Sequence, residues 1–155
     1  MRIGVISDTH GLLRPEAIDG LAGVDHILHA GDVGGIEILE RLRAIAPVTA
    51  IRGNVDGFGP CAALPEIEVV ELSGYSFYML HDIQALDLDP VAAGMAAVIY
   101  GHSHQPKVEE RKGVLYFNPG SAGPKRFSLP VSLGFLETGD GKQAPELSAT
   151  IQELL

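Results

Sequence analysis

Three short runs of polar residues hold most of the side chains in this chain that could do chemistry. They are Asp8-Thr9-His10, Gly31-Asp32 and Gly101-His102-Ser103-His104. With an asparagine and a further histidine, the predicted metal ligands are Asp8, His10, Asp32, Asn54, His81, His102 and His104, of which Asp32, Asn54 and His81 are also expected to take part in catalysis. Seven oxygen and nitrogen ligands suffice for two divalent ions. Two such ions held close together favour attack on phosphorus.

The types of these ligands narrow the choice of metal. Carboxylate, imidazole and amide groups without a thiolate suit Mn²⁺, Fe, Co²⁺, Ni²⁺ or Zn²⁺, and we predict two divalent ions with Mn²⁺ favoured. Several histidines argue against Ca²⁺ and Mg²⁺, which prefer oxygen ligands. A carboxylate such as Asp32 can bridge two ions because both of its oxygens carry spare lone pairs.

The predicted ligands come directly after short apolar runs that are typical of strands. We predict strands at residues 2–7, 26–30, 48–52, 75–80 and 97–100. In an open α/β sheet the carboxyl ends of parallel strands line the functional crevice, so five segments should converge on one rim. Residues two apart point the same way in extended backbone, so Asp8 and His10, like His102 and His104, should share one ion or reach neighbouring ions.

Glycine immediately precedes three of the predicted ligands, namely Asp32, Asn54 and His102. A residue without Cβ permits a sharp turn and a close approach of the backbone. Two further histidines, His26 and His29, lie inside a predicted strand and are expected to pack or hydrogen-bond locally. His29 stands three residues before Asp32, so a role in supporting a ligand is the alternative.

The remaining elements indicate an α/β fold in a single domain, residues 1–155. Helices are predicted at residues 15–21 and 36–45, with a short third one at 87–94. The last third of the chain changes character, with strands predicted at 107–111, 114–117, 131–137 and 146–152. Glycine and proline separate these strands, which predicts a second, more antiparallel sheet. The segment 57–65 is expected to be a loop beside the site.

Composition excludes several classes of protein. With 46% hydrophobic and 20% charged residues the chain is globular rather than disordered, and no apolar run is long enough to span a membrane. The short apolar start, 3–6, does not resemble a signal peptide, so a cytoplasmic location is expected. A net charge of −9 disfavours long nucleic acids as partners. The single cysteine, Cys61, is expected to be a small packed side chain rather than a catalytic thiol.

Six motifs together give the chain a family resemblance from residue 3 to about 136. They are Ser7-Asp8-Thr9-His10-Gly11, His29-Ala30-Gly31-Asp32, Gly53-Asn54-Val55-Asp56, Leu80-His81, Gly101-His102-Ser103-His104 and Asn118-Pro119-Gly120-Ser121. With them the chain resembles the calcineurin-like metallophosphoesterases, and among these the small YfcE-like phosphodiesterases of bacteria and archaea. The resemblance implies a two-sheet β-sandwich flanked by helices, the four-layer fold of that family.

The resemblance also implies a ligand assignment and a reaction. One ion would take Asp8, His10, Asp32 and His104, and the other would take Asp32, Asn54, His81 and His102. Asp32 would bridge the two ions together with a hydroxide, which would attack phosphorus in line. The implied enzyme is a metal-dependent phosphodiesterase that acts on a small phosphodiester.

Four positions near these motifs carry more specific expectations. Many family members have histidine where this chain has Val55, so a leaving-group proton donor is missing and esters with good leaving groups should react faster. Asp82 stands where many members have glycine, and should orient His81 or tune the metal, or else cap a turn or face solvent. Asp56 should support a histidine or hold its turn. Arg126, or its neighbour Lys125, should contact the substrate phosphate or be a solvated loop charge.

Two other functions remain open. A phosphomonoesterase usually needs extra cations for its doubly charged substrate, and the chain has few arginines near the motifs beyond Arg14, Arg52 and Arg126, which favours diesters. A retromer-subunit-like scaffold with a vestigial site is the other alternative, and the complete ligand set argues against it. No membrane partner is expected, and a homodimer is a reasonable assembly.

Overall fold

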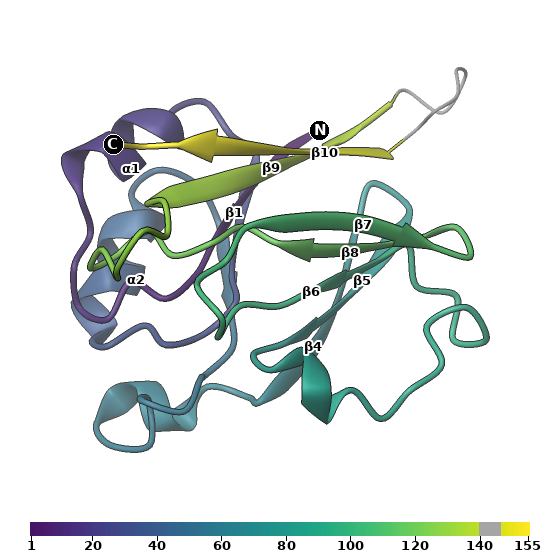
Figure 1. Ribbon diagram of the computed structural model, residues 1–155, viewed down its shortest axis with the longest axis horizontal. Coiled ribbons are helices and arrows are strands. Elements are labelled where there is room, and N and C mark those ends of the chain that lie inside the picture. Colours follow the sequence, from purple (N-terminus) through teal and green to yellow (C-terminus); the bar gives the residue numbers. More distant parts are fainter. Residues whose placement is uncertain (140–146) are drawn as a thin grey trace.

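Two mixed sheets of five strands each make up the body of the protein (Figure 1). The computed structural model describes residues 1–139 and 147–155. Sheet A has the order β10-β9-β1-β2-β3, formed by Leu147–Glu153, Ser132–Thr138, Arg2–Ile6, His26–His29 and Val48–Ala50. Sheet B has the order β4-β5-β6-β8-β7, formed by Ile67–Leu72, Tyr75–Leu80, Ala97–Ile99, Val114–Asn118 and Lys107–Arg111.

Alternating side chains build the core on both faces of each sheet. In β1, Ile3 and Val5 pack between the sheets, whereas Ile6 faces the helices. In β5, Phe77 and Met79 point into the space between the sheets, and the residues that alternate with them face outward. Because successive side chains of a strand point to opposite faces, a strand buried on both sides is apolar at nearly every position.

The helices are few and unequally distributed. α1 (Pro15–Gly20) and α2 (Ile36–Arg43) cover the outer face of sheet A, where α2 buries Ile38, Leu39 and Leu42. Cys61 in the 3₁₀ helix η1 (Pro60–Ala63) is buried in the same cluster, as expected of a packing residue. None of the helices in the described residues reaches the length and apolarity that a membrane crossing needs.

The outer face of sheet B is covered by an irregular segment instead of an α-helix. Side chains of the segment 83–95, which contains the 3₁₀ helix η2 (Ile83–Ala85), pack on Tyr78, Leu80 and their neighbours. The helix predicted at 87–94 is therefore wrong: these residues form turns and bends, in which Pro90 has no N–H to donate and Gly94 has a positive φ. Two mixed sheets flanked by few helices confirm the predicted fold class.

The last third of the chain does not form a separate sheet as expected. β7 and β8 join sheet B, while β9 and β10 join sheet A, where β9 pairs antiparallel with β1. The strand predicted at 146–152 begins at Leu147, and Glu146 lies outside the described residues. β4 was not predicted, although its two-residue turn, Ser73 and Gly74 with φ of 54° and 82°, is typical of a hairpin.

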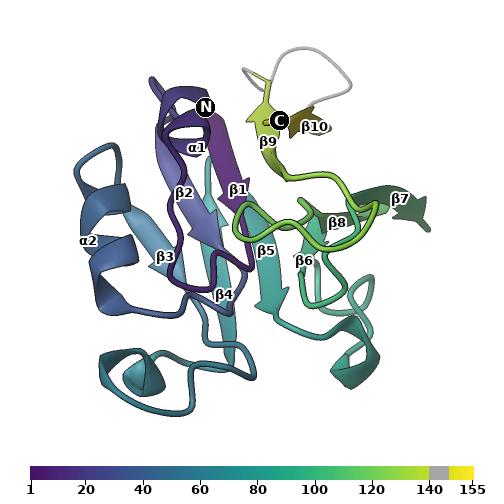
Figure 2. The same ribbon diagram turned by 60° about the vertical axis from the view of Figure 1, so that its left-hand side comes forward.

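The predicted rim exists, but it belongs to two sheets. Strands β1, β2 and β3 run parallel in sheet A, and β5 runs parallel to β6 in sheet B. Figure 2 shows β1, β2 and β5 ending on the same side of the molecule. The loops that follow these strands therefore meet where the carboxyl ends of the two sheets come together.

Candidate metal centre

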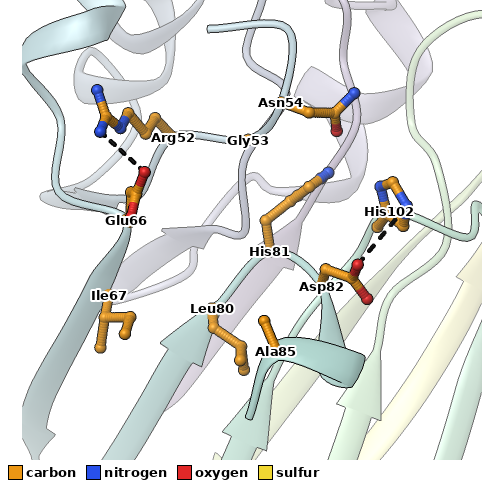
Figure 3. Close-up of a pocket in the computed structure, with 10 residues that line it drawn as sticks. All are labelled: Arg52, Gly53, Asn54, Glu66, Ile67, Leu80, His81, Asp82, Ala85 and His102. Carbon is orange, nitrogen blue, oxygen red and sulfur yellow. Dashed lines mark hydrogen bonds and ion pairs between the residues drawn. The ribbon is translucent and has the colours of Figure 1, made fainter. Parts of the chain in front are cut away.

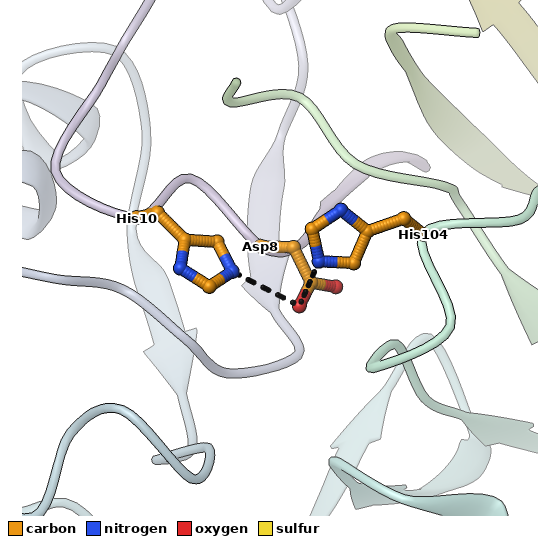
Figure 4. A group of neighbouring side chains, drawn as sticks. All are labelled: Asp8, His10 and His104. Atoms are coloured by element: carbon orange, nitrogen blue, oxygen red, sulfur yellow. Dashed lines mark ion pairs between the residues drawn. The ribbon is translucent and has the colours of Figure 1, made fainter. Parts of the chain in front are cut away.

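A carboxylate oxygen of Asp8 stands at the centre of three histidines. Asp8 Oδ1 lies 3.4 Å from His104 Nε2 and 3.7 Å from His10 Nε2 (Figure 4). It also lies 3.7 Å from Nε2 of His81. This oxygen is buried and has no hydrogen-bond partner among the described residues, and the same holds for His10 Nε2. Burial alone would raise the pKa of the Asp8 carboxyl, but the surrounding histidines and the Ser7 hydroxyl hold that pKa well below its usual range.

Asp32 joins this cluster to a second group of side chains. Its Oδ2 lies 3.4 Å from His10 Nε2 and 3.2 Å from His81 Nε2. Burial alone would raise the pKa of Asp32, but the contact with His81 and a hydrogen bond from the Val55 N–H, 3.0 Å long, lower it. Asp32 thus lies between His10, in the loop that follows β1, and His81, which follows β5.

The ring of His81 is oriented by the backbone. Its Nδ1 lies 2.7 Å from the carbonyl oxygen of Ala30, which can only accept, so this nitrogen carries a proton. In the neutral ring, Nε2 then presents its lone pair to Asp8 and Asp32. Burial alone would lower the pKa of His81, but the hydrogen bonds with Asp32 and Ala30 raise it above its ordinary value. A proton on His81 Nε2, or a metal ion, would relieve the repulsion between this nitrogen and the carboxylate oxygens of Asp8 and Asp32.

Asn54 faces the same acceptors. One end of its amide lies 3.2 Å from His81 Nε2, 3.3 Å from His102 Nδ1, and 3.1 and 3.3 Å from the two oxygens of Asp32. The amide nitrogen suits that end when no cation is bound, because it can donate to these atoms. The other ring nitrogen of His102, Nε2, lies 3.9 Å from Asp82 Oδ2, so Asp82 faces His102 rather than orienting His81. Asp82 also caps η2 by accepting from the Gln84 N–H.

Five of the seven predicted ligands share an unusual backbone conformation. The residues with positive φ are Asp8 (57°), His10 (47°), Asp32 (56°), His102 (71°) and His104 (63°). The expectation that extended backbone aligns each pair is therefore wrong, although both pairs lie within the cluster. Aspartate and histidine tolerate left-handed backbone better than most residues, but each such residue still costs on the order of 1 kcal/mol.

Close packing explains the glycines that precede three ligands. A Cβ at Gly31 would lie 2.7 Å from His81 Nδ1, and the φ of +102° there also favours glycine. A Cβ at Gly53 would lie 2.5 Å from the backbone nitrogen of Asp32, and one at Gly101 would lie 2.6 Å from Asp8 Oδ2. Only Gly31 needs its conformational freedom, whereas the other two give room to carboxylates.

Asp56 ties together the two loops that carry Asp32 and Asn54. Its buried carboxylate accepts hydrogen bonds from the backbone N–H groups of Val33, Gly34 and Gly53, at 2.9–3.0 Å. No histidine is among the hydrogen-bond partners of this side chain in the described residues. Of the two expected roles for Asp56, holding the turn is therefore the one that the structure supports.

His29 also supports the site through the backbone. Its Nδ1 accepts from the Gly31 N–H at 3.1 Å, so its Nε2 carries the proton and donates to Thr9 Oγ1 at 3.0 Å. Thr9 in turn donates to the carbonyl of Val33. Because the ring is completely buried, the pKa of His29 falls to about 4. His26 hydrogen-bonds locally to Thr49, as expected.

Sequence reasoning missed the positioning role of the segment after β8. Asn118 donates to the carbonyl of Gly101 at 3.0 Å and to Ser103 Oγ at 3.1 Å, and Ser121 donates to the carbonyl of Asp8 at 3.0 Å. Asn118 and Ser121 therefore hold two of the three loops whose candidate ligands have left-handed backbone, namely those of Asp8 and His102. Asn118 and Ser121 belong to a quoted family motif, but their contacts cannot be inferred from spacing.

The arginines near the motifs differ in how their side chains are bound. The side chain of Arg126 is exposed and has no hydrogen bond or ion pair within the described part of the chain, so its contact with substrate stays a prediction. Arg14 donates to the carbonyl of Gly123, and Arg52 pairs with Glu66 at 2.9 Å. Val55 is 43% exposed and can neither donate nor accept a proton.

Two overlapping groups in this cluster could each hold a metal ion. Asp8, His10 and His104 offer ligand atoms that all lie within 4.8 Å of one another, and so do Asp8, Asp32 and His81. Unpartnered carboxylate and imidazole lone pairs that face one another suit a bound cation. The cluster thus fits divalent metals of the kind that bind nitrogen and oxygen.

Comparisons with known proteins agree with this geometry. A family model described as the calcineurin-like phosphoesterase superfamily domain matches residues 1–141. A probable metallophosphoesterase of Methanocaldococcus jannaschii is 37% identical over 142 residues, which cover 83% of this chain and 72% of the relative. The phosphodiesterase YfcE of Escherichia coli is 27% identical over 167 residues, which cover 88% of each chain.

Solved structures show the same fold. A structure described as a novel archaeal phosphodiesterase aligns with a TM-score of 0.77 at 24% identity, covering 98% of this chain and 100% of the other. Vacuolar protein sorting 29 of Cryptosporidium parvum aligns with a TM-score of 0.75 at 22% identity, covering 98% and 97%. At this level of identity the likeness is one of fold. Taken with the family model, it places the chain in the calcineurin-like phosphoesterase superfamily.

Proposed function

We propose that this protein is a metal-dependent phosphodiesterase with two divalent ions, Mn²⁺ being favoured. The observation that carries the proposal is the convergence of histidine nitrogens from loops of both sheets on Asp8 Oδ1 and Asp32 Oδ2, with Asp8 Oδ1 and His10 Nε2 lacking a hydrogen-bond partner among the described residues. The family uses divalent metals, and relatives at 27% identity are named phosphodiesterases. Histidine nitrogens beside carboxylates suit Mn²⁺ better than Mg²⁺.

The proposed ligands divide into two sets that share Asp32. Asp8, His10, Asp32 and His104 would hold one ion, and Asp32, Asn54, His81 and His102 would hold the other. The position of Asp32 Oδ2, close to Nε2 of both His10 and His81, supports the bridging role. One end of the Asn54 amide faces His81, His102 and Asp32. With an ion bound among these groups, the amide would turn its oxygen to that end, because an amide oxygen binds a cation and an amide nitrogen does not.

When bound, two divalent ions lower the pKa of water and neutralise charge on the phosphoryl oxygens. The residues of this chain contribute position and charge: the backbone holds His81 through Ala30, and the hydroxyl of Ser7 and the N–H of His102 hold the second oxygen of Asp8. Val55 supplies no proton to the leaving group. We therefore expect aryl esters, whose leaving groups need no protonation, to react fastest.

Diesters are favoured over monoesters because the two arginine side chains Arg14 and Arg52 are already bound to other groups of the protein. The charge of Arg52 is compensated by Glu66, and Arg14 is bound to a backbone carbonyl. A dianionic monoester would therefore gain little from Arg14 and Arg52 beyond what the metals supply. The scaffold alternative is favoured only by likeness of fold to vacuolar protein sorting 29, whereas this chain keeps all seven candidate ligands.

The test is hydrolysis of bis(p-nitrophenyl) phosphate by metal-free protein to which Mn²⁺ is added back. We expect Asp32→Asn to lose at least 100-fold in kcat/KM, because a bridging carboxylate is replaced by a neutral amide. Asp19→Asn, an exposed carboxylate on α1, is the matched control and should retain full activity. Folded wild type that stays inactive with every divalent metal would refute the proposal, as would an Asp32→Asn variant of unchanged activity.

A further inference from the structure

A cavity of about 260 Å³ opens beside the candidate metal centre, on the side of His81 and His102 (Figure 3). We propose that this cavity binds one ester substituent of the phosphodiester, and that the substituent is a flat aromatic ring. The proposal rests on the proposed function, because it places the phosphorus at the metal centre. It adds a substrate class, namely diesters that carry an aryl group or a nucleobase.

The position of the cavity suits a group attached to a phosphate at the centre. Asn54, His81 and His102 line its near end, and these are the candidate ligands of one ion. A phosphodiester bound there has two ester oxygens, and the substituent on one of them extends toward the cavity. Figure 3 shows His81 and Asn54 at one end of the cavity and the Arg52–Glu66 pair away from them.

The floor of the cavity is apolar. Ile67 of β4 and Leu80 of β5 are paired neighbours in sheet B, and Ala85 of η2 lies beside them. Ile67 is 50% exposed, so its side chain offers apolar surface to a group that enters the cavity. A flat ring laid on these side chains would remove apolar surface from water.

The size and charge of the cavity limit what it can hold. Pockets for whole drug-sized ligands measure about 300–1,000 Å³, so this volume suits a single ring system rather than a complete nucleotide or an oligomer. At its far end Arg52 donates to the carbonyl of Ala62 at 3.0 Å and pairs with Glu66 at 2.9 Å. This neutral pair can bind the polar edge of a ring without attracting a second phosphate.

The test compares two variants that alter the cavity with a matched control. Ala85→Leu fills it, Ile67→Ser removes apolar floor, and Ala92→Leu makes the same change as the first at an exposed alanine outside the cavity. Hydrolysis would be measured with Mn²⁺ on three substrates that share p-nitrophenolate as the leaving group. They are bis(p-nitrophenyl) phosphate, methyl p-nitrophenyl phosphate and thymidine 5′-(p-nitrophenyl phosphate). We expect Ala85→Leu to lower kcat/KM for the bis ester by about tenfold to a hundredfold. Ala92→Leu should match wild type.

The substrates separate the possible outcomes. Loss by Ala85→Leu on the bis ester alone assigns the cavity to the retained aryl group, and loss on the methyl ester as well assigns it to the leaving group. A wild-type preference for the thymidine ester that disappears in Ala85→Leu identifies a nucleobase, and the opposite preference identifies a simple aryl group. Wild-type kinetics in both cavity variants on all three esters would overturn the cavity proposal and leave the phosphodiesterase intact. Failure of wild type to hydrolyse any of them would refute the proposed function and the cavity assignment with it.

Discussion

Gly53→Ala is the smallest change that should displace the bridging carboxylate. The added Cβ would overlap Asp32 Oδ1 and would lie 2.5 Å from the backbone nitrogen of Asp32 and 2.8 Å from its Cγ. Ordinary contacts of a Cβ begin near 3.4 Å, so the backbones of the two loops must separate by about 0.9 Å. Neither loop can yield easily, because Asp56 binds both of them.

The size of the effect follows from that displacement. A shift of about 1 Å in a catalytic group can cost about 100-fold in rate, and we expect a loss of that order in kcat/KM. The Val55 N–H that now binds Asp32 Oδ1 at 3.0 Å would move with its loop, which weakens the orientation of the carboxylate further. Overpacking of this kind should also lower the free energy of unfolding by about 1–3 kcal/mol.

The assay pairs this variant with Gly57→Ala in the same loop. A Cβ at Gly57 would meet nothing within 4 Å, and its φ lies outside the left-handed region. Activity toward bis(p-nitrophenyl) phosphate, Mn²⁺ binding by calorimetry and urea unfolding would be measured on both variants. If Gly53→Ala had the same activity and metal stoichiometry as Gly57→Ala, the close approach of Gly53 would not control the position of Asp32.

Two further predictions concern Asp56 and His29, which hydrogen-bond to the loops that carry the candidate ligands. Replacing Asp56 by alanine leaves three backbone N–H groups without their acceptor, and should cost about 2–4 kcal/mol in the urea unfolding free energy of the metal-free protein; a loss below 0.5 kcal/mol would contradict that role. His29 has a folded-state pKa of about 4 against an ordinary 6.5, so the unfolded chain binds the extra proton between these values. The contribution of His29 to the free energy of unfolding should be complete above pH 6.5 and should fall by about 3 kcal/mol as the pH drops toward 4. The His29→Gln variant, compared with wild type by unfolding across that range, should lack this contribution. Parallel pH profiles of the two proteins would show that His29 does not titrate on unfolding.

The ligand set could be predicted because residue type and position after a strand are both local properties. Asp8, Asp32 and His81 each follow an apolar run, and the rim rule then brings them together. The partition of strands between sheets could not be predicted in the same way. Whether β9 pairs with β1 or with β8 is decided by packing between residues more than 100 positions apart, which short patterns do not record.

The supports of the site were also beyond sequence reasoning, for a different physical reason. Asn118 and Ser121 act through hydrogen bonds to backbone carbonyls of loops distant in the chain, and any polar residue in a loop can make such bonds. Val55 was the reverse case. The sequence shows only that the Val55 side chain cannot give a proton, whereas in the structure the Val55 backbone N–H binds Asp32.

Left-handed backbone at the ligands explains why so many supports are needed. Asp8-Thr9-His10 and His102-Ser103-His104 have the same arrangement, with positive φ at the first and third residues. Each such residue disfavours its own conformation, so contacts from elsewhere must impose it. Backbone bonds from the N–H groups of Asp8 and His10 to the carbonyls of Gly31 and Asp32 do so for the first run, and the bond from the His102 N–H to the Asp8 carboxylate does so for the second.

These bonds have a consequence for the order of assembly. The N–H of His102 binds Asp8 Oδ2, and Asn118 holds the carbonyl of Gly101, so the loop of sheet B is docked on a ligand from sheet A through protein groups alone. Hydrogen bonds between loops of the two sheets therefore help to hold the candidate ligands in place, which lowers the conformational cost of ordering them around an ion.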